Sequence, residues 1–197
     1  MKRIFNHWLG KPINYRNYLP HLLIFLKLDG IGVEIGVEKG EFSELILLQS
    51  NLELLYSVDP WKHFPDKMYK DPANLSQEQH EENLRQTEER LGKFGDRSRI
   101  FRMESIEAVN LFCDGELDFV YIDANHLYPF IKNDIEIWFP KVMDGGILAG
   151  HDYMDSVYEG VKFNVKTAVN EFIEVSEQKL YVTEEMFPTW YLIKHRI

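Results

Sequence analysis

The chain has 197 residues, a length that suits a single domain with a sizeable core. Apolar residues make up 45% of it and aromatic residues 14%, which is typical of a folded globule and argues against a disordered chain. The formal net charge of −10 argues against a nucleic-acid partner, because phosphate binding depends on clustered Lys and Arg.

Two features concern the cellular compartment. Cys113 is the one cysteine of the sequence, so no intrachain disulfide can form, which fits a reducing environment. The longest fully apolar run near the N-terminus, Leu22–Leu26, is far shorter than the roughly 20 residues that a membrane-spanning helix needs. No signal-peptide pattern precedes it. We therefore expect a cytoplasmic protein with no membrane partner.

Helical and extended patterns alternate along the chain. In chain order the predicted elements are helix 18–28, strand 32–36, helix 41–49, strand 54–59, helix 77–91, strand 99–103, helix 105–112, strand 117–122, helix 128–142, strand 147–149, helix 160–175, and strands 179–182 and 190–194. Residues 60–75 hold three prolines and show no period, so they are predicted to form a loop or lid.

This order of elements predicts the fold class. Strands that alternate with helices indicate βαβ units and a parallel sheet. The last two strands have only a short turn between them, so they must pair antiparallel. The predicted fold is α/β, with a Rossmann-like, doubly wound sheet of seven strands, mostly parallel, and one antiparallel strand near the C-terminus. One domain is expected to cover residues 1–197, with residues 1–28 as an N-terminal helical extension.

A glycine turn follows the first predicted strand. Glu34 lies within that strand, Gly36 ends it, and Gly40 precedes the next helix. Asp59 ends the second strand, about 20 residues further on. A turn that lets the backbone approach a ligand, followed by a carboxylate that can accept from two ribose hydroxyls, is typical of nucleoside binding in α/β sheets.

The glycine spacing separates two classes of cofactor. A nicotinamide-binding turn has the pattern G-x-G-x-x-G. Gly30 and Gly32 begin such a pattern, but Ile35 stands where the third glycine belongs. An NAD-dependent oxidoreductase therefore remains only as the alternative interpretation.

Two further motifs carry a resemblance to a known family. The stretches IDANHLY (122–128) and GGILAGHDY (145–153) follow the fourth and fifth predicted strands. Together with the glycine turn and the terminal strand pair, they make the chain resemble class I S-adenosylmethionine-dependent methyltransferases, in particular a subgroup with IDxxHxY and GGxxxGHD stretches. The resemblance extends from about residue 30 to the C-terminus. It implies methylation of a small molecule, expected at a hydroxyl oxygen.

The resemblance also implies a cofactor site. Glu34 would lie near the methionine part of S-adenosylmethionine, and Asp59 would bind the ribose. Trp61 would cover one face of the adenine. The residues expected to bind the cofactor are Glu34, Gly36, Val37, Gly40, Asp59, Trp61, Glu104, Ser105 and Asp123.

Polar residues after the fourth and fifth strands are the candidate catalytic groups: Asp123, His126 and His151. In the catechol-type O-methyltransferases, a carboxylate after strand four and a pair of ligands after strand five hold a divalent cation. By position these ligands are Asp123, His151 and Asp152. The divalent cation would be Mn, Fe or Mg, and an imidazole among its ligands favours Mn or Fe.

Two other interpretations of these residues stay open. In one, the site has no metal and His126 or His151 is a general base. In the other, the two histidines only stabilise the ends of the strands. The protein could equally be a relative that binds the cofactor without turnover. Homodimerisation through the N-terminal helix is also predicted, since its apolar run has no assigned partner in the sequence.

Overall fold

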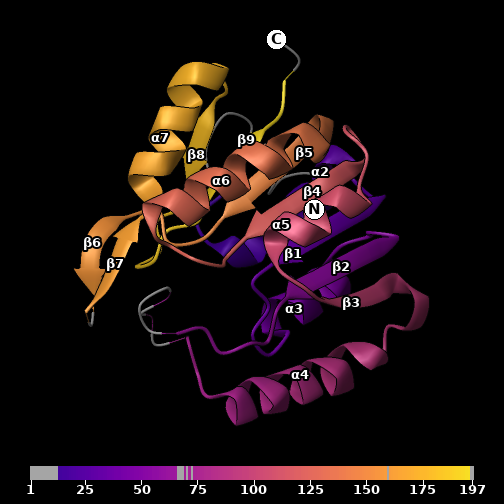
Figure 1. Ribbon diagram of the computed structural model, residues 1–197. Coiled ribbons are helices and arrows are strands. Elements are labelled where there is room, and N and C mark those ends of the chain that lie inside the picture. The colour runs from indigo at the N-terminus through magenta and orange to yellow at the C-terminus, as the bar shows by residue number, and fades with distance from the viewer. Residues whose placement is uncertain (1–12, 66–68, 70, 72, 159, 196–197) are drawn as a thin grey trace.

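A computed structural model describes residues 13–65, 69, 71, 73–158 and 160–195. Its main sheet has seven strands in the order β3-β2-β1-β4-β5-β9-β8 (Figure 1). The strands are β1 Ile31–Ile35, β2 Leu54–Asp59, β3 Ser98–Arg102, β4 Leu117–Ile122, β5 Val142–Gly150, β8 Leu180–Val182 and β9 Trp190–Ile193. Strands β1 to β5 are parallel, and β9 lies antiparallel to both β5 and β8. The predicted sheet, with its one antiparallel strand, is confirmed.

Helices cover both faces of the sheet. They are α2 Leu19–Leu26, α3 Glu41–Gln49, α4 Gln77–Gly92, α5 Ser105–Ala108, α6 Tyr128–Trp138 and α7 Val165–Ser176, with 3-10 turns at Arg16–Tyr18, Gly95–Arg97, Val109–Leu111 and Phe139–Lys141. Figure 1 shows α5, α6 and α7 in front of the sheet and α2 and α3 behind it. Because both faces are covered, every residue of β4 is buried.

The side chains of β4 divide between two apolar cores. Val120 and Ile122 pack with residues of α6 and α7. Phe119 and Tyr121 point to the other face and pack with residues of α2 and α3. This alternation follows from the two-residue period of a strand. It leaves Asp123, the next residue, at the carboxyl end of the central strand.

Two predicted helices are wrong in part. The helix expected over 160–175 begins only at Val165, because the preceding residues form a separate hairpin of β6 (Asp155–Tyr158) and β7 (Val161–Asn164). Gly160 has a φ of +85°, which glycine adopts without steric cost. The helix expected over 128–142 also ends earlier, since β5 already begins at Val142.

The N-terminal helix packs within the chain. The helix predicted over 18–28 is α2, and residues 1–12 of the predicted extension lie outside the described residues. Leu19, Leu22 and Leu23 are buried in the core that α2 shares with α3. Packing within the chain therefore accounts for this apolar run, and homodimerisation through it stays a prediction. Among the described helices, none is both long and apolar enough to cross a bilayer.

Candidate active site

The glycine turn brings the ends of β1 and β4 into close contact. Gly36 has a φ of +83°, and a Cβ atom there would lie 2.0 Å from the carbonyl oxygen of Asp123. The Asp123 N–H donates to the carbonyl of Ile35 at 2.7 Å. Gly40 also has a positive φ, +74°, at the start of α3. Only glycine fits at position 36, which fixes the β1 turn directly against the residue that ends β4.

Asp59 stabilises the same turn from the end of β2. Its Oδ2 accepts from the N–H groups of Val37 (2.9 Å) and Glu38 (3.1 Å), and its Oδ1 accepts from that of Trp61 (2.7 Å). Burial raises the pKa of Asp59, and these three N–H groups oppose that rise. Oδ2 accepts from two N–H groups, whereas Oδ1 accepts from one and has a second lone pair that could accept from a ligand hydroxyl.

The residues expected at the adenine are less accessible. Trp61 is fully buried, and its Nε1–H donates to the carbonyl of Glu38 at 2.7 Å. An adenine could therefore stack on Trp61 only after the groups that cover its ring had moved. Glu104 is exposed and lies 3.3 Å from Lys62.

Ser105 belongs to a partly buried network with Asp134 and Trp138. Its hydroxyl donates to Asp134 Oδ1 at 2.7 Å and accepts from the indole N–H of Trp138 at 2.8 Å. Burial raises the pKa of Asp134 to about 6, and the bond from Ser105 opposes that rise. Asp134 is thus a buried partner of Ser105, although the charged residues around it in the sequence suggest a solvated face.

Glu34 is a buried carboxyl group in the middle of the sheet. It is 2% exposed, and the Ser43 hydroxyl donates to its Oε2. Burial raises the pKa of Glu34 to about 8, whereas the Ser43 bond lowers it. Since this pKa lies above neutrality, Glu34 carries a proton in most molecules at pH 7.

Replacing Glu34 with glutamine is expected to change the pH dependence of folding. The pKa of Glu34 is about 8 in the folded state and 4.5 as its ordinary value, so the folded chain binds more protons between these limits. Stability therefore falls as the pH rises through this window, by about 1.4 kcal/mol per pH unit at most. Glu34→Gln removes that loss, so the variant should be the more stable protein at pH 8.

Urea unfolding at several pH values measures this effect. The exposed Glu38 provides the control, because Glu38→Gln removes a carboxylate that is 61% exposed. The free energy of unfolding of each protein is then plotted against pH. Plots for Glu34→Gln and the parent chain that stay parallel from pH 4.5 to 8 would contradict the prediction.

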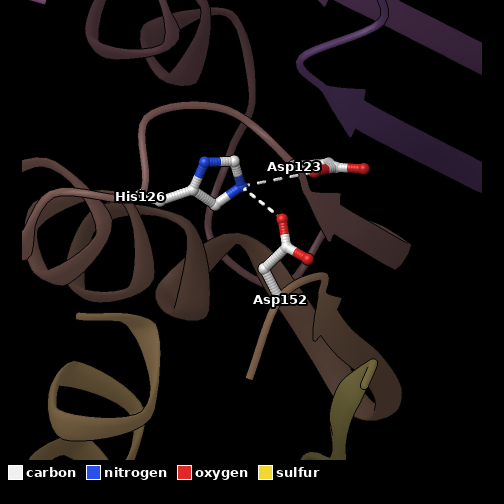
Figure 2. A group of neighbouring side chains, drawn as sticks. All are labelled: Asp123, His126 and Asp152. Atoms are coloured by element: carbon white, nitrogen blue, oxygen red, sulfur yellow. Dashed lines mark ion pairs between the residues drawn. The ribbon is translucent and has the colours of Figure 1, made fainter. Parts of the chain in front are cut away.

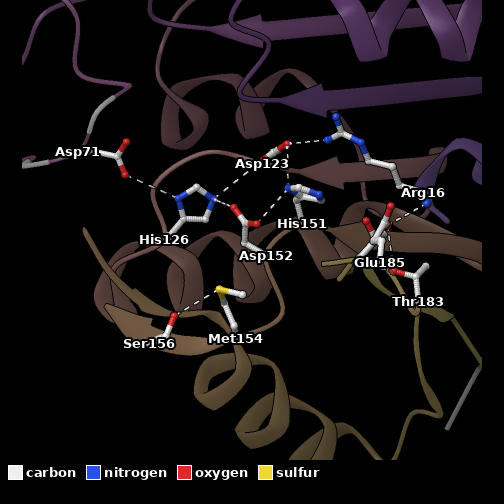
Figure 3. Close-up of polar contacts among 11 residues, drawn as sticks. Arg16, Asp71, Asp123, His126, His151, Asp152, Met154, Ser156, Thr183 and Glu185 are labelled. Carbon is white, nitrogen blue, oxygen red and sulfur yellow. Dashed lines mark hydrogen bonds and ion pairs between the residues drawn. The ribbon is translucent and has the colours of Figure 1, made fainter. Parts of the chain in front are cut away.

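His126 lies among three carboxylates, of which Figure 2 shows Asp123 and Asp152 and Figure 3 also shows Asp71. Its Nε2 is 3.0 Å from Asp152 Oδ2 and 3.6 Å from Asp123 Oδ1, and its Nδ1 is 3.9 Å from Asp71 Oδ2. Burial lowers the pKa of His126, but Asp123, Asp152 and Asp71 outweigh it and raise the pKa to about 11. In this arrangement His126 is an imidazolium at neutral pH and cannot accept a proton.

His151 lies on the other side of Asp152 (Figure 3). Its Nδ1 is 3.2 Å from Asp152 Oδ1 and 3.8 Å from Asp123 Oδ2. Burial raises the pKa of Asp152, but His126 and His151 outweigh it and hold that pKa well below its usual range. Asp152 is thus an ionised carboxylate with one imidazole on each oxygen.

The structure brings all the predicted catalytic residues together, with a different grouping of possible ligands. Among the described residues, ligand atoms of Asp123, His126 and Asp152 lie within 4.8 Å of one another. The sequence favoured His151 over His126 as the imidazole ligand. The difference arises because the segment after β4 turns back and places His126 above the strand ends.

Two neighbours of this cluster had no signal in the sequence. Arg16 Nη1 lies 3.4 Å from Asp123 Oδ2, across 107 residues of sequence (Figure 3). Phe163 of β7 packs on His126 with ring centroids 5.0 Å apart, and the Asn164 N–H donates to the His126 carbonyl at 3.1 Å. The hairpin that the sequence did not predict therefore supports the site.

Fold and site together define a class. A seven-stranded sheet of this order, with a glycine turn after β1 and an acid after β2, is the class I methyltransferase architecture. A family model described as a methyltransferase domain matches residues 33–153, more than half of the chain. The chain belongs to this methyltransferase family and is an S-adenosylmethionine-dependent enzyme. This assignment decides against the NAD-dependent alternative.

Solved structures share the fold at low sequence identity. A proposed caffeoyl-CoA O-methyltransferase from Staphylococcus aureus is 17% identical, with a TM-score of 0.65, over 98% of this chain and 90% of that one. The O-methyltransferase TomG from Streptomyces achromogenes, in complex with S-adenosylmethionine, is 15% identical, with a TM-score of 0.58, over 91% and 79%. An O-methyltransferase from Bacillus cereus, in complex with S-adenosylhomocysteine, is 13% identical, with a TM-score of 0.59, over 90% and 80%. Among curated protein sequences none matches significantly.

Proposed function

We propose that the protein transfers the methyl group of S-adenosylmethionine to a hydroxyl oxygen of a small molecule. The carrying observation is the group of two imidazoles and two carboxylates, His126, His151, Asp123 and Asp152, at the adjoining ends of β4 and β5. Ligands of doubly wound sheets bind beyond the carboxyl ends of the strands, next to the glycine turn. The three structural relatives described above as O-methyltransferases support oxygen as the acceptor atom.

The cofactor would occupy the turn and the strand ends around it. Glu34 and Asp123 would face its methionine part, and the backbone at Gly36, Val37 and Gly40 would approach it closely. Asp59 would bind the ribose, with Trp61, Glu104 and Ser105 at the adenine. When bound, S-adenosylmethionine supplies a methyl group on a sulfonium, which a correctly positioned oxygen can attack in line.

His151 is the proposed general base. The Asp152 carboxylate 3.2 Å from Nδ1 favours the tautomer with its proton there, and this leaves Nε2 to accept a proton from the acceptor hydroxyl. His126 is a poorer candidate, because Asp123, Asp152 and Asp71 keep it protonated. No nucleophilic side chain is needed, since the acceptor oxygen itself attacks the methyl group.

The same cluster also fits a divalent cation. Asp123, His126 and Asp152 would hold it, because their ligand atoms lie within 4.8 Å of one another. His126 would bind as the neutral imidazole, so the cation would take the place of the Nε2 proton. A mixed set of carboxylates and imidazole suits Mn or Fe better than Mg. Such a cation would acidify the acceptor hydroxyl.

Turnover with a panel of hydroxylated acceptors tests the proposal. Transfer of the methyl group from S-adenosylmethionine to oxygen, identified by mass spectrometry of the product, is the expected result. Loss of turnover with a chelator, and its recovery with Mn²⁺, would assign a role to the cation. Methylation of amines alone would overturn the choice of oxygen. Cofactor binding without turnover on any acceptor would indicate a non-catalytic relative.

Replacing Asp59 with alanine is expected to weaken binding of S-adenosylmethionine by about 1.5–3 kcal/mol, the range for hydrogen bonds to a charged group. Isothermal titration measures the change. Asp29→Ala is the matched control, because Asp29 is exposed at the opposite end of β1. An affinity of Asp59→Ala equal to that of the parent chain would refute the placement of the ribose.

A further inference from the structure

The carboxyl ends of the strands carry a strongly acidic group of side chains. Asp59, Asp123 and Asp152 lie at this end of the sheet, and Asp71 approaches from the loop before α4. Such a site suits cations and hydroxyl groups. It would repel the anionic part of a ligand unless a positive charge were placed among the carboxylates.

Arg16 places a positive charge in this acidic region. Its guanidinium lies 3.4 Å from Asp123 Oδ2 and close to Tyr121, and its central carbon is 5.1 Å from the centroid of the Phe42 ring. The side chain keeps 34% of its surface exposed. A guanidinium has five N–H donors, so its contacts with Asp123 and Tyr121 leave donors for a further anion. Three other cations near the strand ends already face carboxylates. The imidazolium of His126 lies among Asp71, Asp123 and Asp152. Lys62 and Arg102 pair with Glu104 and Glu81.

The segment before α2 holds Arg16 in this position. The N–H of Ile13 donates to the Tyr191 hydroxyl at 3.1 Å, and the carbonyl of Asn14 accepts from the Glu184 N–H at 3.0 Å. The N–H of Arg16 itself donates to Glu185 Oε1 at 2.9 Å (Figure 3). These three bonds attach the segment to β9 and to the turn between β8 and β9. Because the backbone is fixed, the guanidinium reaches the end of β4 at a reduced entropic cost.

We propose that Arg16 binds the α-carboxylate of the methionine part of S-adenosylmethionine. That carboxylate is the anionic group of the cofactor, whose sulfonium and ammonium groups are cations suited to the surrounding acids. The methionine part is placed at the ends of β1 and β4, where Arg16 meets Asp123, so the inference rests on the proposed cofactor site. The planar guanidinium can bind both oxygens of a carboxylate at once.

The test compares cofactors that differ in the carboxylate. Arg16→Gln should weaken binding of S-adenosylmethionine and S-adenosylhomocysteine by about 10- to 100-fold, the loss expected for a hydrogen-bonded charge pair. It should leave the affinity for decarboxylated S-adenosylmethionine and for 5′-methylthioadenosine within about twofold of the parent chain, since neither ligand has the carboxylate to lose. Arg16→Lys keeps the charge but not the planar pair of donors. Its affinity for S-adenosylmethionine should lie between that of the parent chain and that of Arg16→Gln.

Arg99→Gln provides the control, because Arg99 is exposed on the outer strand β3 and pairs with Asp96, which precedes that strand. Thermal unfolding of each variant checks that the chain remains folded at the temperature of the titration. An equal loss of affinity for all four ligands would overturn the proposal. It would mean that Arg16 maintains the shape of the pocket and does not bind the carboxylate. Unchanged affinities for all four would overturn it as well. The titration contains no methyl acceptor, so failure of the proposed O-methylation would leave this result standing.

Discussion

Replacing His151 with alanine should lower the turnover number by about 10²- to 10⁴-fold, the usual contribution of a general base. The affinity for S-adenosylmethionine should change little, since His151 contacts Asp152 and Asp123 rather than the glycine turn. The physical reason is that the acceptor hydroxyl would lose the imidazole that removes its proton. Steady-state kinetics, with titration of the cofactor on the same protein, measures both quantities.

A purely structural histidine can be told apart from a base by chemical rescue. Added imidazole should restore part of the turnover of His151→Ala, because a small base can enter the space left by the side chain. It should do nothing for His151→Gln, in which the amide fills that space. His21→Gln on α2 is the control and should keep full activity. Loss of activity in His151→Ala that imidazole does not restore, together with weaker cofactor binding, would refute the role as a base.

Most of the fold could be predicted from local patterns. The helix over Glu41–Gln49 and the strands over Leu54–Asp59 and Leu117–Ile122 have the predicted bounds, because each is a periodic run that ends at a glycine or polar residue. The hairpin of β6 and β7 was missed although apolar and polar residues alternate after Gly160, over Val161–Asn164. The predicted helix was placed from residue 160 and so covered this short strand, whereas the helix begins at Val165.

The site was predictable only where its residues end strands. Asp123, His151 and Asp152 follow β4 and β5 directly, so the topology alone places them together. His126 required knowledge of how the segment after β4 turns, and Arg16 has no local signal. Its contact depends on the bonds of residues 13–16 to the β8–β9 turn and to β9, which join segments more than 160 residues apart.

The protonation of His126 could not be derived from sequence either. A histidine near an aspartate is as compatible with a neutral base as with a fixed imidazolium. The distances show that His126 faces carboxylates at both ring nitrogens, whereas His151 faces them at Nδ1 alone. The proposed division of roles between the two residues therefore follows from geometry.

Replacing Gly36 with alanine should both destabilise the fold and weaken cofactor binding. The new Cβ would lie 2.0 Å from the carbonyl oxygen of Asp123 and 2.6 Å from its carbonyl carbon, so the backbone of β1 or β4 must shift. The left-handed φ of +83° adds about 1–2 kcal/mol, and the steric overlap a further 1–3 kcal/mol or so. Denaturant unfolding measures the sum, and titration with S-adenosylmethionine measures the displacement of the turn.

Gly145→Ala separates the two contributions. Gly145 has nearly the same backbone conformation, with a φ of +85°, but a Cβ there would meet no atom within 4 Å. Its replacement should therefore cost only the conformational part, about 1–2 kcal/mol, and leave cofactor affinity unchanged. An equal loss of stability in both variants would mean that the close contact between Gly36 and Asp123 does not constrain the turn. A larger loss at Gly36 that coincides with weaker cofactor binding would tie the steric fit of β1 against β4 directly to the methyl-donor site.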